Sequence, residues 1–330
     1  MLCEEDNQKH TIKMAATFDD ILQARDRLTG KILRTPLVLL NTKMDDNTKI
    51  YLKLENLQTI GSFKIRGALN AIADLEPETL KNGVYTASAG NFAQGLAWAA
   101  SNLGVTCDVL IPEYAPKTKL EAIERYGGKT HKIAFDEWWK VICSHHYEGM
   151  TGRFIHPVSE RDVIAGNGTI GLEIFEDLPE VDSVIVPYGG GGLTTGIATA
   201  LKHLKPSCKI YASEVETAAP LAASLEAGKP VFCNFQPSFI DGIGSKSVLD
   251  EMWPLVSGLV AKSLVVSIQE VADTIKMMVE RNHVVAEGAG ASSVAAALSG
   301  TAGKGNIVCI VTGGNLDLSK LISILEGKLP

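Results

Sequence analysis

The sequence lacks several features that would each point to a particular class of protein. It has no run of about 18 apolar residues that could span a bilayer, and its first twenty residues are too polar for a signal peptide. It has no excess of positive charge, because 31 basic and 38 acidic side chains give a formal net charge of −7. Its six cysteines show no CxxC or metal-ligand spacing. We therefore expect a cytoplasmic globular protein without disulfides, structural zinc, or a nucleic-acid or membrane partner.

The residues that are present indicate an α/β fold. Apolar residues make up 45% of the 330 positions, and this length suggests two domains at about 100–200 residues each. Short apolar runs alternate with helical patterns, which is typical of parallel sheets with crossover helices. The predicted strands are 50–54, 84–87, 108–111, 183–186, 210–213 and 307–311. The predicted helices are 92–102, 117–126, 193–204 and 268–281, the last opened by a Ser267-x-x-Glu270 capping box.

A single lysine stands between a turn and a helix in the segment GSFKIRG, which runs from Gly61 to Gly67. Burial and nearby positive charge lower the pKa of an ammonium so placed, and the freed amine can add to a carbonyl and form a Schiff base. Most lysines are instead solvated at the surface. Lys64 alone therefore does not establish a site.

Four consecutive glycines follow a predicted strand and open a helix: Gly189, Gly190, Gly191 and Gly192. They leave several backbone N–H groups free to turn inward and form an anion nest at the positive end of the helix. We expect this loop to hold phosphate, since one glycine would be enough for a turn. A dinucleotide fingerprint is the alternative, with Glu214 as the ribose-binding acid, but Thr194 stands where the fingerprint needs Gly or Ala.

Two further strand ends carry small polar residues. Ser88, Ala89, Gly90 and Asn91 join a predicted strand to a helix, where backbone donors and an amide suit a carboxylate and a neighbouring oxygen anion. The same residues could cap the helix without any ligand. The segment from Thr312 to Asn315 follows the last predicted strand, at the carboxyl end where ligands usually bind in such sheets.

Taken together, these segments resemble the fold-type II pyridoxal 5'-phosphate enzymes, in the branch of serine/threonine dehydratases (threonine ammonia-lyases) and serine racemases. The resemblance rests on residues 62–67, 88–91, 189–192, 241–244, 287 and 312–315, in this order. It implies a two-domain fold similar to the β subunit of tryptophan synthase, with parallel-sheet domains flanked by helices. Residues 1–81 and 159–330 would form a large cofactor-binding domain, and residues 82–158 a small mobile domain.

The resemblance also implies a role for each of these residues. Lys64 would hold pyridoxal phosphate as a Schiff base and later remove the Cα proton of the substrate. The four glycines would hold its phosphate. The other residues implied to line the cofactor are Phe63, Asn91, Gly242, Glu287 and Thr312, and those implied to bind the substrate carboxylate are Ser88, Ala89, Gly90 and Asn91.

The implied reaction is β-elimination from a β-hydroxy L-amino acid such as L-threonine or L-serine, which yields a 2-oxo acid and ammonia. Thr312 favours elimination, because a neutral hydroxyl at the pyridine nitrogen makes the ring a weaker electron sink than a carboxylate would. Ala89 stands where racemases have a serine as second acid/base, which weakens the serine racemase alternative. If Trp138 and Trp139 line the pocket rather than pack in the core, a bulkier substrate such as L-threo-phenylserine would fit.

The remaining alternatives explain fewer residues. A nicotinamide-dependent dehydrogenase would leave Lys64 and Asn91 without a role. A non-catalytic relative that keeps the fold as a binding module is the third alternative. Glu214 and Ala218 are weak candidates for a divalent-cation site, but Pro220 stands where a further acid is needed. We therefore expect a solvent-facing Glu214 and no metal. Because members of the family commonly form dimers or tetramers, we also expect a homo-oligomer.

Overall fold

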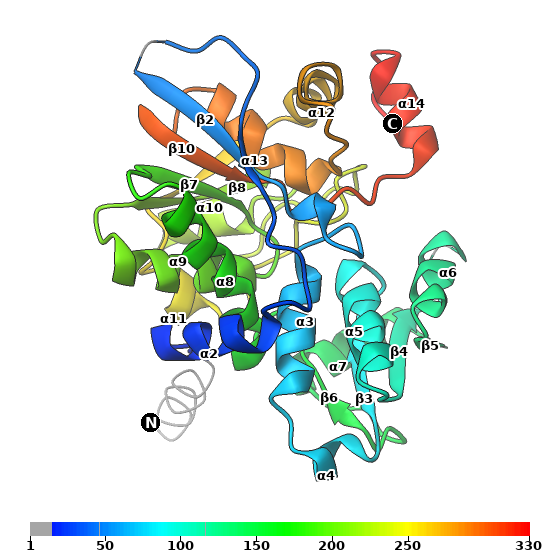
Figure 1. The fold of residues 1–330 in the computed structure, drawn as a ribbon. Coiled ribbons are helices and arrows are strands. Elements are labelled where there is room, and N and C mark those ends of the chain that lie inside the picture. The colour runs from blue at the N-terminus through cyan, green and yellow to red at the C-terminus, as the bar shows by residue number, and fades with distance from the viewer. Residues whose placement is uncertain (1–14, 46, 116) are drawn as a thin grey trace.

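The computed structural model describes residues 15–45, 47–115 and 117–330, and in this part of the chain two sheets are surrounded by helices (Figure 1). The larger sheet has the strand order β1-β2-β10-β7-β8-β9, and the smaller has the order β5-β4-β3-β6. β1 runs antiparallel to β2, whereas the other neighbouring strands of both sheets are parallel. The predicted α/β class with parallel sheets is thus confirmed.

The bounds of the elements are as follows. The strands are β1 (Leu37–Leu39), β2 (Thr48–Lys53), β3 (Val84–Ala87), β4 (Cys107–Pro112), β5 (Lys129–Ile133), β6 (Arg153–Phe154), β7 (Ser183–Pro187), β8 (Lys209–Val215), β9 (Lys262–Val266) and β10 (Gly305–Ile310). The helices are α2 (Phe18–Leu28), the 3-10 helix η1 (Glu55–Leu57), α3 (Lys64–Ala73), α4 (Pro77–Leu80), α5 (Asn91–Asn102), α6 (Lys117–Arg125), α7 (Phe135–Ser144), α8 (Arg161–Asp177), α9 (Gly192–Leu204), α10 (Pro220–Ala227), α11 (Trp253–Val256), α12 (Ile268–Asn282), α13 (Gly288–Leu298) and α14 (Leu318–Leu325).

The central strand β7 is buried on both faces, which explains its unbroken apolar sequence. Val184 and Val186 belong to the core on the side of α8 and α9. Ile185 points to the opposite side and belongs to the core that includes α12 and α13. Two helical layers therefore enclose the larger sheet, and the loops at the carboxyl ends of its strands remain to form a site.

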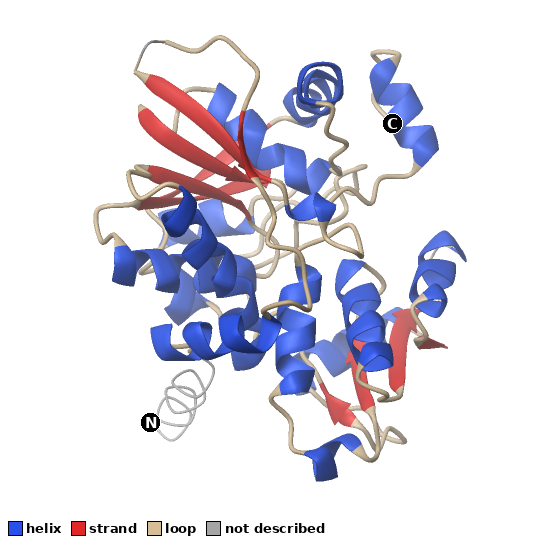
Figure 2. Ribbon diagram, in the orientation of Figure 1, coloured by secondary structure: helices blue, strands red, loops and turns tan. Residues whose placement is uncertain are grey.

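The smaller sheet has its own core and lies apart from the larger one (Figure 2). Val84 of β3 packs on one side with α5, and Tyr85 packs on the other side with α7. The helix α3 lies against both α5 and α8, so it connects the two parts of the molecule. Its first residue, Lys64, is consequently placed between the two sheets.

The sequence located most of the elements that surround the site, but not all of them. The six predicted strands correspond to β2, β3, β4, β7, β8 and β10, and the predicted capping box at Ser267 and Glu270 is present at the start of α12. The helix predicted at 268–281 is the next predicted element after the strand at 210–213, but in the structure α10, α11 and β9 lie between β8 and α12. None of the described helices has both the length and the apolar character needed to cross a membrane.

Candidate active site

A cavity of about 360 Å³ opens at the carboxyl ends of β3, β7 and β10. The elements named from the sequence converge here because parallel strands direct their carboxyl ends to one edge of each sheet. Every residue that the sequence analysis named for the cofactor or for the substrate carboxylate lines this cavity, namely Phe63, Lys64, Ser88, Ala89, Gly90, Asn91, Gly189, Gly190, Gly191, Gly192, Gly242, Glu287 and Thr312.

Lys64 projects its amine into this cavity from the first residue of α3. Its Nζ donates a hydrogen bond to the carbonyl of Pro157 at 3.3 Å and lies 5.0 Å from the centre of the Phe63 ring. Burial lowers the pKa of this amine to about 8, although the charge of Glu287 acts in the opposite direction. A larger fraction of Lys64 is therefore a free amine at neutral pH than of an ordinary surface lysine.

The four glycines form the turn between β7 and α9, with Gly191 at a φ of +98° as the N-cap. Within the described part of the chain, the amides of residues 189–192 donate no hydrogen bond. A Cβ atom on Gly190 or Gly192 would lie 2.5 or 2.4 Å from Val158, so larger residues do not fit. The loop thus presents free N–H groups at the positive end of a helix, which is the donor set that a phosphate requires.

Asn91 begins α5 and belongs to a chain of polar side chains beside the cavity. Its Nδ2 donates to both carboxylate oxygens of Glu287, at 3.0 and 3.1 Å. Its Oδ1 accepts a hydrogen bond of 2.8 Å from Nδ2 of Asn315. Burial raises the pKa of Glu287 to about 7; the bond from Asn91 lowers it and the charge of Asp241 raises it further. The carboxyl group is therefore partly protonated near neutral pH.

Thr312 provides a test of whether these residues fit pyridoxal phosphate. Its Oγ1 is buried at the end of β10 and, among the described residues, has no hydrogen-bond partner. An unpaired buried hydroxyl is costly, and a pyridine nitrogen would satisfy it. Together with the amine of Lys64 and the free amides of the glycine loop, this hydroxyl gives a donor set that fits the cofactor at its aldehyde, phosphate and ring nitrogen.

The two adjacent tryptophans have different environments. Trp138 lines the cavity, with its ring 5.9 Å from that of Phe135 and its Nε1 bonded to the carbonyl of Leu110 at 3.1 Å. Trp139 is 40% exposed on the outer surface of α7. Phe135 and Tyr114, which also line the cavity, were not named from the sequence. Pro157 and Val158 were missed as well, because neither residue type carries a signal of its own.

Glu214 is not solvent-facing, so that expectation was wrong. It is 1% exposed, and its carboxylate accepts hydrogen bonds from the amides of Leu221 and Ala222 at 2.8 and 2.7 Å. The hydroxyl of Ser263 donates a third bond at 2.6 Å. The carboxylate therefore caps α10, since the first amides of a helix lack partners within it. This position also removes Glu214 from the role of ribose-binding acid.

Comparisons with known proteins agree with this geometry. Residues 28–313 match the family model described as "Pyridoxal-phosphate dependent enzyme". The chain is 41% identical over 318 residues to L-threonine ammonia-lyase of Thermotoga maritima, which covers 95% of this chain and 79% of that protein. It is also 38% identical to the catabolic L-threonine dehydratase TdcB of Escherichia coli K12, in an alignment of 322 residues that covers 95% of this chain and 97% of that protein.

Among solved structures, maize serine racemase matches with a TM-score of 0.85 and 34% identity, over 95% of this chain and 98% of that one. With the match to the family model, these likenesses show that the alternative of a nicotinamide-dependent dehydrogenase was wrong. They also bear out the resemblance to serine/threonine dehydratases and serine racemases. The chain belongs to the family of pyridoxal-phosphate dependent enzymes.

Proposed function

We infer that the protein is a pyridoxal-phosphate-dependent ammonia-lyase that converts L-threonine to its 2-oxo acid and ammonia. The observation that carries this inference is the amine of Lys64, which lines one cavity with the glycine loop of residues 189–192, in a chain 41% identical to a threonine ammonia-lyase. In the net reaction the β-hydroxyl leaves as water, and a water molecule later replaces the amino group. L-serine, which has the same leaving group, is proposed as a second substrate.

Each side of the cavity contributes a different part of the chemistry. Bound pyridoxal phosphate supplies the electron sink for the Cα–H bond. Lys64 is proposed to accept the Cα proton, because its lowered pKa leaves a free amine near neutral pH. The loop of residues 88–91, which leads into the N-terminus of α5, is proposed to bind the substrate carboxylate. Thr312 is proposed to keep the pyridine nitrogen uncharged, which favours elimination.

A bulkier β-hydroxy amino acid is a second candidate, and the aromatic wall of the cavity favours it. Tyr114, Phe135 and Trp138 line the same cavity as Lys64, and their neighbouring ring centres are 5.9 Å apart. An aromatic wall of this kind would accommodate the phenyl group of L-threo-phenylserine. Serine racemisation is less well supported, since Ala89 offers no hydroxyl and only the neighbouring Ser88 could act in its place.

The assignment is tested by measuring 2-oxo acid release from L-threonine, L-serine and L-threo-phenylserine side by side. Lys64→Ala is expected to lower the rate at least about a hundredfold, since it removes the proposed base and the point of attachment. Lys81→Ala is the matched control, because this lysine is exposed and, among the described residues, its one ion pair is with the exposed Glu78. Ammonia release that survives in Lys64→Ala would refute the mechanism. Interconversion of serine enantiomers faster than pyruvate formation would refute the interpretation of Ala89.

We further propose that residues 82–158 move as a small domain against a large domain of residues 1–81 and 159–330. Residues 1–14 of the large domain lie outside the described part of the chain. In support, the strands of the smaller sheet all come from residues 84–154. Side chains from this segment meet the rest of the molecule across the cavity, as Lys119 does with Asp241 at 2.9 Å.

We also propose a cytoplasmic homo-oligomer, in keeping with the family resemblance and with the free thiols of the five described cysteines.

A further inference from the structure

The turn between β6 and α8 touches the proposed cofactor site at two points. The carbonyl of Pro157 accepts the hydrogen bond from Nζ of Lys64. Val158 packs so closely on the glycine loop that a Cβ on Gly190 would meet its side chain at 2.5 Å, and one on Gly192 would meet its carbonyl oxygen at 2.4 Å. The conformation of this turn therefore determines both the position of the amine and the shape of the anion nest.

His156 holds the turn in place through one ring nitrogen. Its Nδ1 accepts hydrogen bonds from the amides of Val158 and Ser159, at 3.1 and 2.8 Å. The hydroxyl of Ser159 lies 2.8 Å from the same nitrogen. Asn and Asp side chains stabilise turns in the same way, by accepting from the backbone two and three residues further on. The imidazole is only 1% exposed, so water does not replace these bonds.

The protonation state of His156 is fixed by this arrangement. Burial lowers the pKa of the ring to about 3, and the nearby His145 acts in the same direction, so the ring is neutral at physiological pH. Because Nδ1 accepts hydrogen bonds from amides, the single ring proton resides on Nε2.

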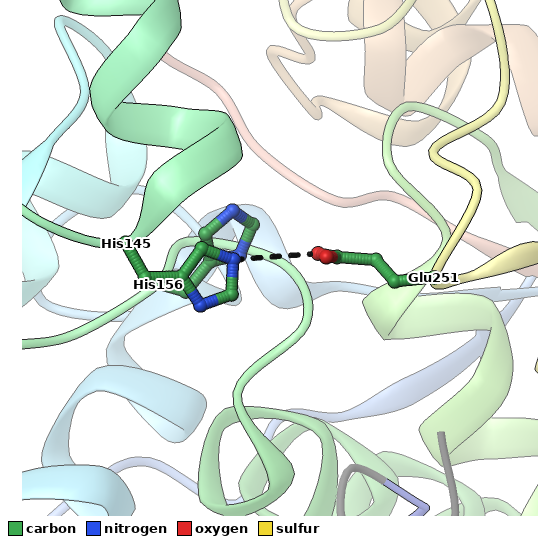
Figure 3. A group of neighbouring side chains, drawn as sticks. All are labelled: His145, His156 and Glu251. Carbon is green, nitrogen blue, oxygen red and sulfur yellow. Dashed lines mark ion pairs between the residues drawn. The ribbon is translucent and has the colours of Figure 1, made fainter. Parts of the chain in front are cut away.

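His145 and Glu251 complete a group that resembles a set of metal ligands (Figure 3). One potential ligand atom from each of His145, His156 and Glu251 lies within 4.8 Å of the others. A metal ion needs an unprotonated nitrogen with a free lone pair. In His156, Nδ1 is occupied by amides and Nε2 carries the proton. His156 therefore stabilises the turn and has no nitrogen lone pair available to bind a metal ion.

We propose that His156 is a positioning residue for the cofactor site, and this inference rests on the proposed function. By fixing the amides of Val158 and Ser159, it holds Val158 against the phosphate-type loop and directs the Pro157 carbonyl at Lys64. Its main effect is on the phosphate end, because Val158 packs against two of the four glycines, whereas Lys64 donates a single hydrogen bond to the turn.

The test compares pyridoxal phosphate with pyridoxal, which has the aldehyde but not the phosphate. Apoenzyme is titrated with each, and binding is followed by the visible absorbance of the Schiff base. His156→Leu leaves two buried amides without an acceptor and should weaken pyridoxal phosphate binding by about ten- to a hundredfold. Pyridoxal binding should weaken distinctly less. His156→Asn keeps an acceptor and should stay within about threefold of the unmodified protein.

His145→Asn is the matched control, since it removes the stacked ring, 4.5 Å away, and leaves the Nδ1 bonds of His156 intact. It should not change the ratio of the two affinities. The proposal would be overturned if His156→Leu weakened the binding of pyridoxal phosphate and of pyridoxal equally. It would also be overturned if His156→Asn lost as much affinity for pyridoxal phosphate as His156→Leu does.

Two further outcomes remain informative. If thermal unfolding shows that His156→Leu apoenzyme does not fold, Val158→Ala replaces it and should lower the preference for pyridoxal phosphate over pyridoxal. An unchanged preference in that variant would overturn the proposal. If the unmodified protein forms no Schiff base with pyridoxal phosphate, the proposed function itself fails. A normal Schiff base with no difference among the variants refutes only the role of His156.

Discussion

Lys64 and Glu287 line the same cavity, and burial moves the pKa of each toward neutrality, to about 8 for the amine and about 7 for the carboxyl. The two shifts have the same physical cause, because a low-dielectric environment disfavours the charged form of either group. The charge of Glu287 opposes the shift of Lys64. A change in the charge of Glu287 should therefore shift the pKa of Lys64 by a measurable amount.

The pH dependence of cofactor attachment checks this coupling. Only the neutral amine attacks an aldehyde, so Schiff-base formation in the apoenzyme should be slow below the pKa of Lys64 and rise with pH to a midpoint near 8. In Glu287→Gln the midpoint should fall, because the negative charge that raises the pKa of Lys64 is gone. Stopped-flow absorbance measures both rates. A midpoint near that of an ordinary lysine, about 10.4, would contradict the effect of burial.

Some residues of the site could be named from the sequence, whereas others depend on contacts that no motif encodes. Lys64 and the four glycines stand in segments whose chemistry is local. Pro157 contributes only a backbone carbonyl, which any residue could provide. The burial of Glu214 depends on α10 turning its first amides toward it, and this contact joins positions seven and eight residues apart.

At the scale of secondary-structure elements, the turn from β7 to α9 is constrained unevenly along its length. Gly189 and Gly192 lie in the same turn but differ in the space around them. A Cβ on Gly189 would have its nearest neighbour at 3.6 Å, an ordinary contact, whereas one on Gly192 would lie 2.4 Å from the backbone oxygen of Val158. Backbone atoms cannot move aside as the end of a side chain can.

This difference predicts unequal effects of two alanine substitutions. Gly192→Ala should weaken pyridoxal phosphate binding by about tenfold or more, because overpacking of this kind costs about 1–3 kcal/mol. Gly189→Ala should have a clearly smaller effect. Equilibrium titration of the two apoproteins measures the difference. Equal affinities would show that the contact with Val158 does not shape the loop.

Two elements that were not predicted from the sequence, β5 and α8, lack the patterns on which such a prediction depends, and each for a physical reason. β5 has the sequence KTHKI and is an edge strand, so its polar side chains do not alternate with a buried apolar face. α8 contains Gly166, Gly168 and Gly171, which lower helix propensity. These glycines are needed for close packing, since a Cβ on Gly166 would lie 2.6 Å from the carbonyl oxygen of Arg66.

At the scale of the whole molecule, α3 lies between the two sheets and packs against helices of both parts (Figure 1). Loops that follow strands of both sheets line the cavity, and polar contacts link the two parts across it. Lys119 pairs with Asp241, and Asn91 bonds to Glu287. If residues 82–158 form a mobile domain, these contacts should strengthen or break together as the cavity closes. Closure would exclude water from the reacting groups.

Small-angle scattering of the holoenzyme tests the proposed movement and the proposed assembly together. The forward scattering should give the mass of two or four chains, and addition of a substrate-like amino acid without a β-hydroxyl should reduce the radius of gyration. The Lys64→Ala protein serves as the control, because it lacks the amine that holds the cofactor. A monomer mass would contradict the oligomer, and an unchanged radius would count against closure.

The sequence by itself determined the α/β class, the family and the residues whose function follows from a local segment, such as Lys64 and the glycine loop. These features depend on short-range properties: apolar periodicity, turn chemistry and the spacing of reactive groups. The tertiary structure decided which side chains are buried together, and so set the shifted pKa values of Lys64 and Glu287. It also decided that His156, remote from every motif, supports the turn beneath the cofactor site, because such contacts arise only when distant segments pack.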